Sequence, residues 1–284
     1  MPLAARAAPG KLEVVATITI LGDMVKEVGG AHVALTTLVG PDGDAHAFEP
    51  SPADARALSA ADLVVVNGLG LEGWMDRLIR ASGYHGPVVV ASRGVVPRNL
   101  DEDDGTVADP HAWQDLENGH RYVVNIEAAL AAADPVHAAD YQAAADRYLA
   151  ALDAMDAHVR TEIAEVPPER RKVVSSHDAF GYFGQAYGVE FVAPQGISEH
   201  AEPSAADMAR LIDQIRREHI KVLFLENALS PRLVEQIGRE TDAVVGGTLY
   251  ADALSPPDGP APTYLDMFRH NLRLIKAAMS GKAT

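Results

Sequence analysis

Four residues with metal-binding side chains lie in segments that follow predicted strands, and one of them, His177, directly follows its strand. They are three histidines and one aspartate: His46, His111, His177 and Asp252. Because ligands of open α/β sheets bind beyond the carboxyl ends of the strands, we expect these side chains to face one cleft. Three imidazoles and one carboxylate make a complete tetrahedral shell for zinc, and imidazole also suits copper, nickel and iron. The competing interpretation, that these are ordinary loop histidines among the 11 of the chain, stays open on spacing alone.

Strands and helices alternate before residue 135. β-Branched residues cluster in four stretches that we expect to be strands: 12–19, 32–39, 63–67 and 87–92. Apolar residues at helical spacing run from Ile20 to Val28, and Ser51 followed by Pro52 indicates the start of another helix. This alternation favours a mostly parallel sheet with helices on both faces.

A polar stretch interrupts this pattern at residues 99–109. It contains the acidic run Asp101-Glu102-Asp103-Asp104-Gly105 and has no apolar period. We expect a mobile surface loop here, and favour a solvated loop over a weak attraction of zinc by these carboxylates.

One long helix is predicted over residues 135–166. The segment contains no glycine and no internal proline, and apolar side chains recur at three- and four-residue steps from Tyr141 to Val159. At 1.5 Å per residue such a helix would span roughly 45 Å, and Pro167-Pro168 ends it.

The alternation resumes after this helix. Strands are expected over residues 172–176, 189–193, 222–225 and 243–247, and helices over 179–187, 204–218, 231–239 and 264–279. The predicted fold class is therefore α/β, with two lobes, each a mostly parallel sheet flanked by helices, joined by one long rigid helix. The predicted domains are an N-terminal lobe at 1–134, the linking helix at 135–166 and a C-terminal lobe at 167–284.

Composition excludes several classes of function. Lys and Arg total 24 against 40 for Asp and Glu, and the net charge of −16 argues against nucleic-acid binding. The chain has no cysteine, which excludes disulfides, thiolate metal sites, cysteine nucleophiles and a lipid-bearing cysteine. Its apolar runs fall short of the about 18 residues of a membrane span. The Ala-rich start lacks the apolar middle of a signal peptide and is compatible with the product of its removal.

Several motifs resemble those of the solute-binding proteins of zinc and manganese ABC transporters. They follow one another along almost the whole chain: Gly43-Asp44-Ala45-His46, Glu49-Pro50-Ser51-Pro52, Ala61-Asp62-Leu63-Val64-Val65, Asp109-Pro110-His111-Ala112-Trp113, Ser176-His177-Asp178-Ala179-Phe180-Gly181-Tyr182-Phe183 and Ala201-Glu202-Pro203-Ser204. The resemblance implies two α/β lobes bridged by a rigid helix with the metal between them. It also implies that His46, His111, His177 and Asp252 are the ligands.

The third ligand position separates the branches of that family. Manganese relatives typically have glutamate there, whereas this chain has His177, which indicates the zinc branch. The resemblance therefore implies a high-affinity protein that captures Zn²⁺ in the periplasm and delivers it to an ABC transporter permease. A manganese-binding homologue is the alternative. One departure is that many zinc relatives carry a histidine-rich loop where residues 100–108 are short, acidic and without histidine.

The implied partner is the membrane permease, and a periplasmic metallochaperone stays open as a zinc donor. We expect an exported, monomeric protein, with its signal peptide absent from this chain, and no nucleic-acid partner. Because a ligating histidine usually donates its second N–H to a carboxylate or carbonyl, Asp178 and Glu226 are candidates for that contact, with helix capping or surface charge as equal alternatives.

Two functions of other classes compete with transport. A zinc hydrolase keeps one coordination position open for water, which four protein ligands would fill. The chain also has no His-Glu-x-x-His or Gly-x-Ser-x-Gly motif, so we do not expect an enzyme. An adhesin or scaffold with a structural metal is the third candidate, and a metal-free protein that keeps its fold would count against it.

Overall fold

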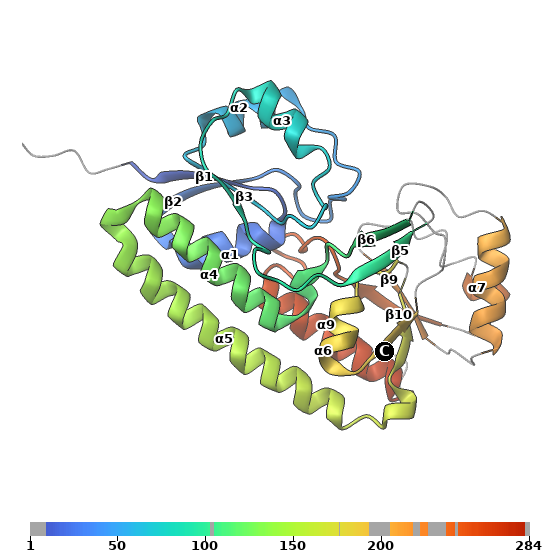
Figure 1. The fold of residues 1–284 in the computed structure, drawn as a ribbon. Coiled ribbons are helices and arrows are strands. Elements are labelled where there is room, and N and C mark those ends of the chain that lie inside the picture. Colours follow the sequence, from blue (N-terminus) through green and yellow to red (C-terminus); the bar gives the residue numbers. More distant parts are fainter. Residues whose placement is uncertain are drawn as a thin grey trace, which may run out of the picture.

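The computed structural model describes residues 10–102, 105–175, 177–192, 205–217, 222–226, 237–241 and 244–281. Within these ranges the chain forms two four-stranded parallel sheets and one two-stranded antiparallel sheet (Figure 1). We call the parallel sheets, with their helices, the first and second lobes. The α/β fold class predicted from the sequence is confirmed. The limits of the lobes at residues 134 and 167 stay a prediction.

The first sheet has the strand order β2-β1-β3-β4. Its strands are β1 Leu12–Ala16, β2 Val33–Thr37, β3 Leu63–Val66 and β4 Val88–Val90. Helices α1 (Thr19–Gly29) and α4 (Leu116–Ala133) cover one face, and α2 (Pro52–Ala60) and α3 (Met75–Ser82) cover the other (Figure 1). Every residue of β3 is buried, as expected of a strand covered on both faces.

The predicted strand over 12–19 runs too far, because Ile18 caps α1 and Thr19 already begins that helix. β-Branched residues occupy both the strand end and the first helical turn, so composition does not mark the boundary. The predicted start of α2 is confirmed. The Ser51 hydroxyl accepts from the N–H of Ala53 and Asp54, and the Asp54 carboxylate accepts from the N–H of Ser51.

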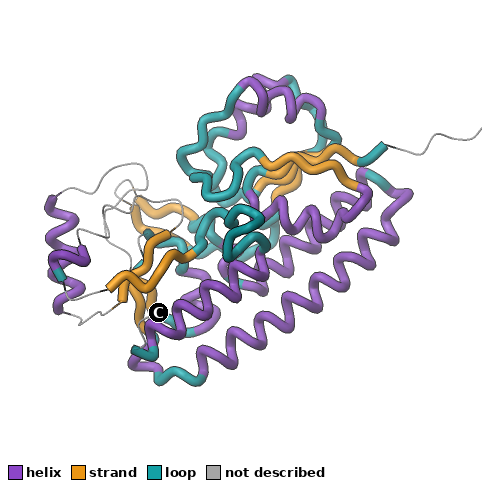
Figure 2. Tube along the Cα trace, turned by 180° about the vertical axis from the view of Figure 1, so that it is seen from behind, coloured by secondary structure: helices purple, strands orange, loops and turns teal. Residues whose placement is uncertain are grey.

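The predicted long helix is confirmed as α5 (Ala138–Ala164), preceded by the short 3₁₀ turn η3 (Pro135–His137). α5 packs against α1 and α4 of the first lobe and against α6 (Gly181–Tyr187) and α9 (Tyr264–Met279) of the second. Seen from behind, it passes both sheets (Figure 2). The side chains buried along it are those at helical spacing, Tyr141, Tyr148, Leu152, Met155 and Val159 among them.

The second sheet has the strand order β10-β9-β7-β8. Its strands are β7 Lys172–Val174, β8 Glu190–Val192, β9 Val222–Glu226 and β10 Val244–Leu249. The bounds of α9 match the prediction. The helix predicted over 204–218 is α7 (Ala205–Arg217), whereas its expected cap Ser204 and most of the helix predicted over 231–239 lie outside the described residues. Further 3₁₀ turns are η1 (Gly30–His32), η2 (Ala112–Gln114) and η4 (Pro168–Arg170).

The predicted loop over residues 99–109 is wrong in one respect. Strands β5 (Asn99–Glu102) and β6 (Gly105–Ala108) pair as an antiparallel hairpin, in which Leu100 lies opposite Val107. Gly105 has a φ of +129°, which favours glycine. The acidic run hides this short alternation, because its charges dominate the composition of the segment. Asp103 and Asp104 lie outside the described residues.

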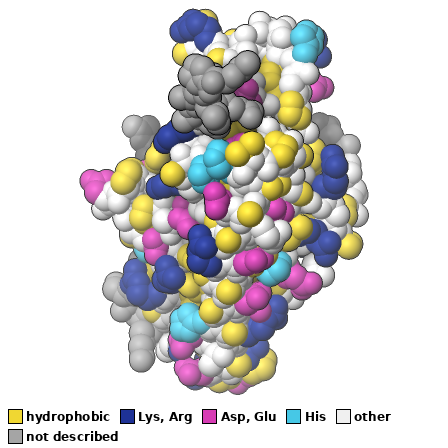
Figure 3. Space-filling view, turned by 90° about the vertical axis from the view of Figure 1, so that its left-hand side faces the viewer, with side chains coloured by type: hydrophobic (Ala, Val, Ile, Leu, Met, Phe, Trp, Pro, Cys, Tyr) yellow, Lys and Arg dark blue, Asp and Glu magenta, His cyan; other side chains and the backbone are white. Residues whose placement is uncertain are grey.

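Apolar side chains of both lobes and of α5 form one large core, and a smaller cluster lies beneath α7. On the face shown in Figure 3, acidic and basic side chains are interspersed with apolar ones. Each helix in the described ranges is too short or too polar to span a membrane.

Candidate metal centre

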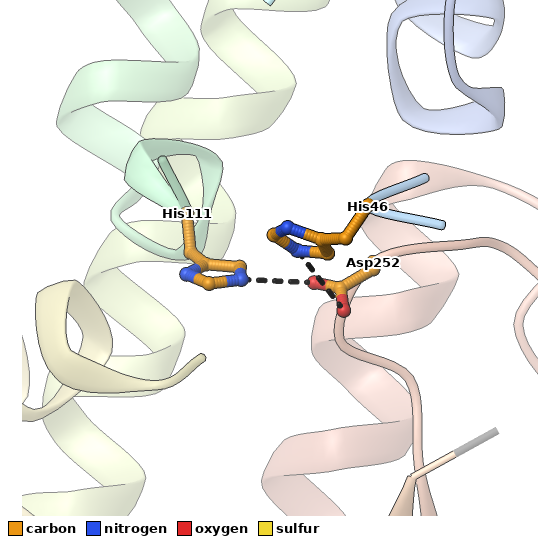
Figure 4. A group of neighbouring side chains, drawn as sticks. All are labelled: His46, His111 and Asp252. Carbon is orange, nitrogen blue, oxygen red and sulfur yellow. Dashed lines mark ion pairs between the residues drawn. The ribbon is translucent and has the colours of Figure 1, made fainter. Parts of the chain in front are cut away.

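The four predicted residues meet between the lobes. His46 lies in the loop between β2 and α2, His111 immediately precedes η2, and Asp252 follows β10. These three side chains face one another in Figure 4, and one ligand atom from each lies within 4.8 Å of the other two. His177, which follows β7, places its Nε2 3.1 Å from Oδ2 of Asp252.

The Asp252 carboxylate lies among the three imidazoles. Besides the 3.1 Å contact with His177, Asp252 Oδ1 lies 3.5 Å from Nε2 of His111, and Oδ2 lies 4.0 Å from Nε2 of His46. In a tetrahedral zinc site with bonds of about 2.1 Å, the donor atoms lie about 3.4 Å apart. The three distances bracket that value but end on both oxygens of Asp252. The group whose ligand atoms all lie within 4.8 Å of one another comprises His46, His111 and Asp252, and His177 joins it through its 3.1 Å contact with Asp252.

The cluster is buried. The exposed fraction of the side chain is 15% for His46, 3% for His111, 6% for His177 and 5% for Asp252. In the described part of the chain, Nε2 of His111 and Oδ1 of Asp252 make no hydrogen bond. Buried polar atoms normally have a partner, and a cation between them would supply one for both.

A second carboxylate orients His111. Asp109, which is fully buried, has its Oδ1 2.8 Å from Nδ1 of His111 and accepts the His111 backbone N–H to the same oxygen at 3.0 Å. A carboxylate oxygen accepts a hydrogen bond, so this contact is made by the His111 tautomer that carries its hydrogen on Nδ1 and leaves Nε2 to face Asp252. Sequence reasoning proposed Asp178 and Glu226 for such a role and missed Asp109, although it lies two residues before His111.

Asn67 holds the turn around His111 in place through hydrogen bonds. The Asn67 Nδ2 donates to the carbonyl of Pro110 at 3.0 Å, and the hydroxyl of Tyr122 donates to Oδ1 of Asn67 at 2.6 Å. Both contacts are buried. Asn67 follows β3, so the same sheet edge that faces the cluster also supports it. The residue next to His46 is held in a similar way, because Trp74 Nε1 donates to the carbonyl of Ala45 at 2.9 Å.

The loop of Asp252 is bonded to the turn that follows His111. The carbonyl of Ala251 accepts from Nε1 of Trp113 at 2.8 Å and from Nε2 of Gln114 at 2.9 Å. The loop of His46 is bonded to the loop of Asp252, because Asp42 donates its N–H to the carbonyl of Leu254 at 3.1 Å. These main-chain, indole and amide contacts therefore hold the loops of His46, His111 and Asp252 together as one unit.

Opposed effects set the charges in the cluster. Burial opposes ionisation of Asp252, but the charges of His177 and His111 and a hydrogen bond with His177 outweigh it and hold the Asp252 pKa below its usual range. Burial also disfavours the charged form of His111, yet the charge of Asp252 and the bond to Asp109 raise the His111 pKa. The cluster thus pairs a carboxylate with imidazoles that bind either a proton or a metal ion. Protons and metal ions therefore compete for the imidazole nitrogens.

The chain matches one protein family and is similar to several metal-binding proteins. The family model described as "Zinc-uptake complex component A periplasmic" (ZnuA) matches residues 14–278. The manganese-binding lipoprotein MntA of Halalkalibacterium halodurans is 32% identical over 269 residues, which cover 95% of this chain and 89% of MntA. The iron-binding protein YfeA of Yersinia pestis is 33% identical over 266 residues, which cover 93% of this chain and 85% of YfeA.

A solved structure shares the fold. The periplasmic zinc-binding protein TroA of Treponema pallidum superposes with a TM-score of 0.88 at 33% identity, and the match covers 95% of this chain and 99% of TroA. The names of these three relatives therefore include manganese, iron and zinc.

Proposed function

Because this chain belongs to the ZnuA family of periplasmic metal-binding components of ABC transporters, we propose that it binds Zn²⁺ through His46, His111, His177 and Asp252. Members of this family are substrate-binding components and not enzymes. The metal is therefore the cargo of the protein. We further propose that it captures zinc in the periplasm and delivers it to the membrane permease.

One observation carries the choice of metal: three imidazoles surround a single buried carboxylate at 3.1 to 4.0 Å. Imidazole donors suit zinc, whereas manganese prefers more oxygen ligands and is lowest in the Irving–Williams order. The relatives bind different metals by name, so the choice rests on the donor set of this chain. His177 is the decisive donor, because a glutamate there would give two nitrogens and two carboxylates.

Four protein donors also fit binding better than catalysis. A catalytic zinc keeps a coordination position for water, and four donors would occupy a tetrahedral shell. A structural metal is less suitable, because the lobes share a large apolar core that includes α5. The metal-free protein should therefore keep its fold.

Uptake and release need only a limited motion in this proposal. α5 packs on both lobes along its length and resists a wide hinge movement. His177 comes from the second lobe, whereas the other three donors are tied together, so a small displacement of the His177 segment would open the shell. A monomeric state is part of the proposal, and a periplasmic metallochaperone stays open as the zinc donor.

Zinc titration of the metal-free protein against a chelator tests this function. We expect one ion per chain, a strong loss of affinity in His111→Ala, and no change in His158→Ala, an exposed histidine of α5. Circular dichroism should show the same fold with and without zinc. A chain that binds no zinc, or a His111→Ala variant that binds like the wild type, would contradict the proposal.

A further inference from the structure

Arg98 shares a buried carboxylate with His111. Its Nη1 lies 2.6 Å from Oδ2 of Asp109, while the other oxygen of Asp109 bonds the ring of His111 at 2.8 Å. Asp109 has no exposed surface. One carboxylate is therefore held between a guanidinium on one side and a proposed ligand on the other.

The same arginine contacts the second lobe. A β-carbon added at Gly181, the first residue of α6, would lie 1.5 Å from Nη1 of Arg98 and 2.1 Å from its Cζ. The guanidinium thus occupies the space that a side chain at position 181 would need. Arg98 also donates its backbone N–H to the hydroxyl of Tyr182 at 2.9 Å, and that hydroxyl donates to the carbonyl of Asp109 at 3.1 Å.

These contacts join the base of the β5–β6 hairpin to the segment that carries His177. Asp178, the neighbour of His177, has its Oδ1 4.0 Å from Nη1 of Arg98. Arg98 therefore touches both the partner of His111 in the first lobe and the residues that follow His177 in the second. Arginine suits this place because its planar group keeps its charge and makes directed bonds to a carboxylate.

We propose that Arg98 is a positioning residue of the metal centre. It fixes Asp109, and through Asp109 the ring of His111, in an orientation that depends on the guanidinium fitting against Gly181 of the other lobe. The inference rests on the proposed function, because it assigns a role within the proposed zinc site. It links the geometry of one donor in the first lobe to the placement of the segment that carries another donor in the second.

The charge of Arg98 by itself disfavours metal binding, since a cation near the centre repels a metal ion. Its pairing with Asp109 at 2.6 Å compensates that charge at the centre. Loss of a residue that orients a metal ligand typically weakens metal binding 10- to 100-fold, roughly. We therefore expect the loss of orientation to outweigh the relief of repulsion.

A double-mutant cycle tests this inference through zinc dissociation constants. Arg98→Gln should weaken zinc binding about 10- to 100-fold, and Arg98→Lys should recover part of the loss. Gly181→Ala should also weaken binding, because its β-carbon displaces the guanidinium. The double variant should be no weaker than Arg98→Gln, since the added methyl group then has no guanidinium to displace.

The tautomer of His111 provides a readout that a purely structural role would not change. Long-range ¹H–¹⁵N spectra of the metal-free protein, recorded at a pH high enough for the His111 ring to be neutral, should show the hydrogen on Nδ1 in the wild type and a mixture of tautomers in Arg98→Gln and Gly181→Ala. If Arg98→Gln did not fold, the zinc dissociation constant and the His111 tautomer could still be measured in Arg98→Lys and Gly181→Ala.

The outcomes separate the two proposals. A wild-type chain that binds no zinc counts against the proposed function. A wild type that binds zinc, with Arg98→Gln equally tight or tighter, or with additive losses in the double variant, overturns the role of Arg98 alone.

Discussion

Leu254 donates its backbone N–H to Oγ1 of Thr19 at 2.8 Å, which joins the loop after β10 to the first turn of α1. Asp252 lies two residues before Leu254. It follows a strand of the second sheet, yet this bond and those of Ala251 hold its loop against the first lobe. His46, His111 and Asp252 therefore form one preassembled part of the centre, and His177 forms the other.

Replacing Thr19 tests this preassembly. Thr19→Val removes the acceptor of the Leu254 N–H without changing the shape of the side chain, and should lower the free energy of unfolding by about 1–3 kcal/mol. Zinc affinity should fall as well, because Asp252 loses part of its support. Thr19→Ser keeps the hydroxyl and is the matched control. Chemical denaturation and chelator competition measure the two effects, and wild-type zinc affinity in Thr19→Val would argue against the preassembled unit.

The tip of the β5–β6 hairpin should be dispensable for zinc binding. The contacts of Arg98 and Asp109 lie at its base, and the pair Leu100–Val107 remains when residues 101–106 are replaced by Asn-Gly, a two-residue turn. We expect equilibrium zinc affinity within about twofold of the wild type, because no proposed donor or positioning contact is removed. Isothermal titration measures this, and a large loss of affinity would assign the acidic tip a direct part in binding.

A buried carboxylate away from the centre should make stability depend on pH. Asp23 of α1 accepts the N–H of Tyr264 at 2.8 Å, at the start of α9, and burial raises its pKa from 3.8 to about 6. Because the pKa is higher in the folded chain, the stability contributed by Asp23 is full below the unfolded value of 3.8 and is lost as the pH rises through about 6.

Asp23→Asn removes this dependence while keeping an oxygen that can accept the Tyr264 N–H. Between about pH 4 and pH 7, the free energy of unfolding of the wild type should fall by roughly 2 kcal/mol relative to that of the variant. Urea denaturation at several pH values gives the difference. A constant difference across this range would show that Asp23 is ionised throughout.

The order of most helices and strands could be predicted from the sequence, but not all of their first and last residues. Helical spacing located α9 and the long helix, because both bury one continuous face. The β5–β6 hairpin was missed, since its only apolar cross-strand pair is Leu100 with Val107 and acidic residues surround it. The end of β1 was placed too late because Thr17, Ile18 and Thr19 suit a strand and a helix start alike.

The candidate donors were identifiable from their motifs, whereas their supports were not. Asp109 was visible two residues before His111 but was not distinguished from a turn residue. The contact of Arg98 with Gly181 joins positions far apart in the chain and exists only where the lobes meet. The support of Asp252 by Thr19 is of the same kind, because no local pattern connects an α1 hydroxyl with a loop near the end of the chain.

Direct competition between Zn²⁺ and Mn²⁺ for the metal-free chain, in the wild type and in His177→Glu, tests the central claim most directly. Three imidazoles should make the wild type take up zinc in large preference to manganese, and exchanging one imidazole for a carboxylate should reduce that preference. Elemental analysis after equilibration with both metals gives the ratio. Manganese bound as tightly as zinc by the wild type, or a ratio unchanged in His177→Glu, would contradict a zinc site built on His46, His111, His177 and Asp252.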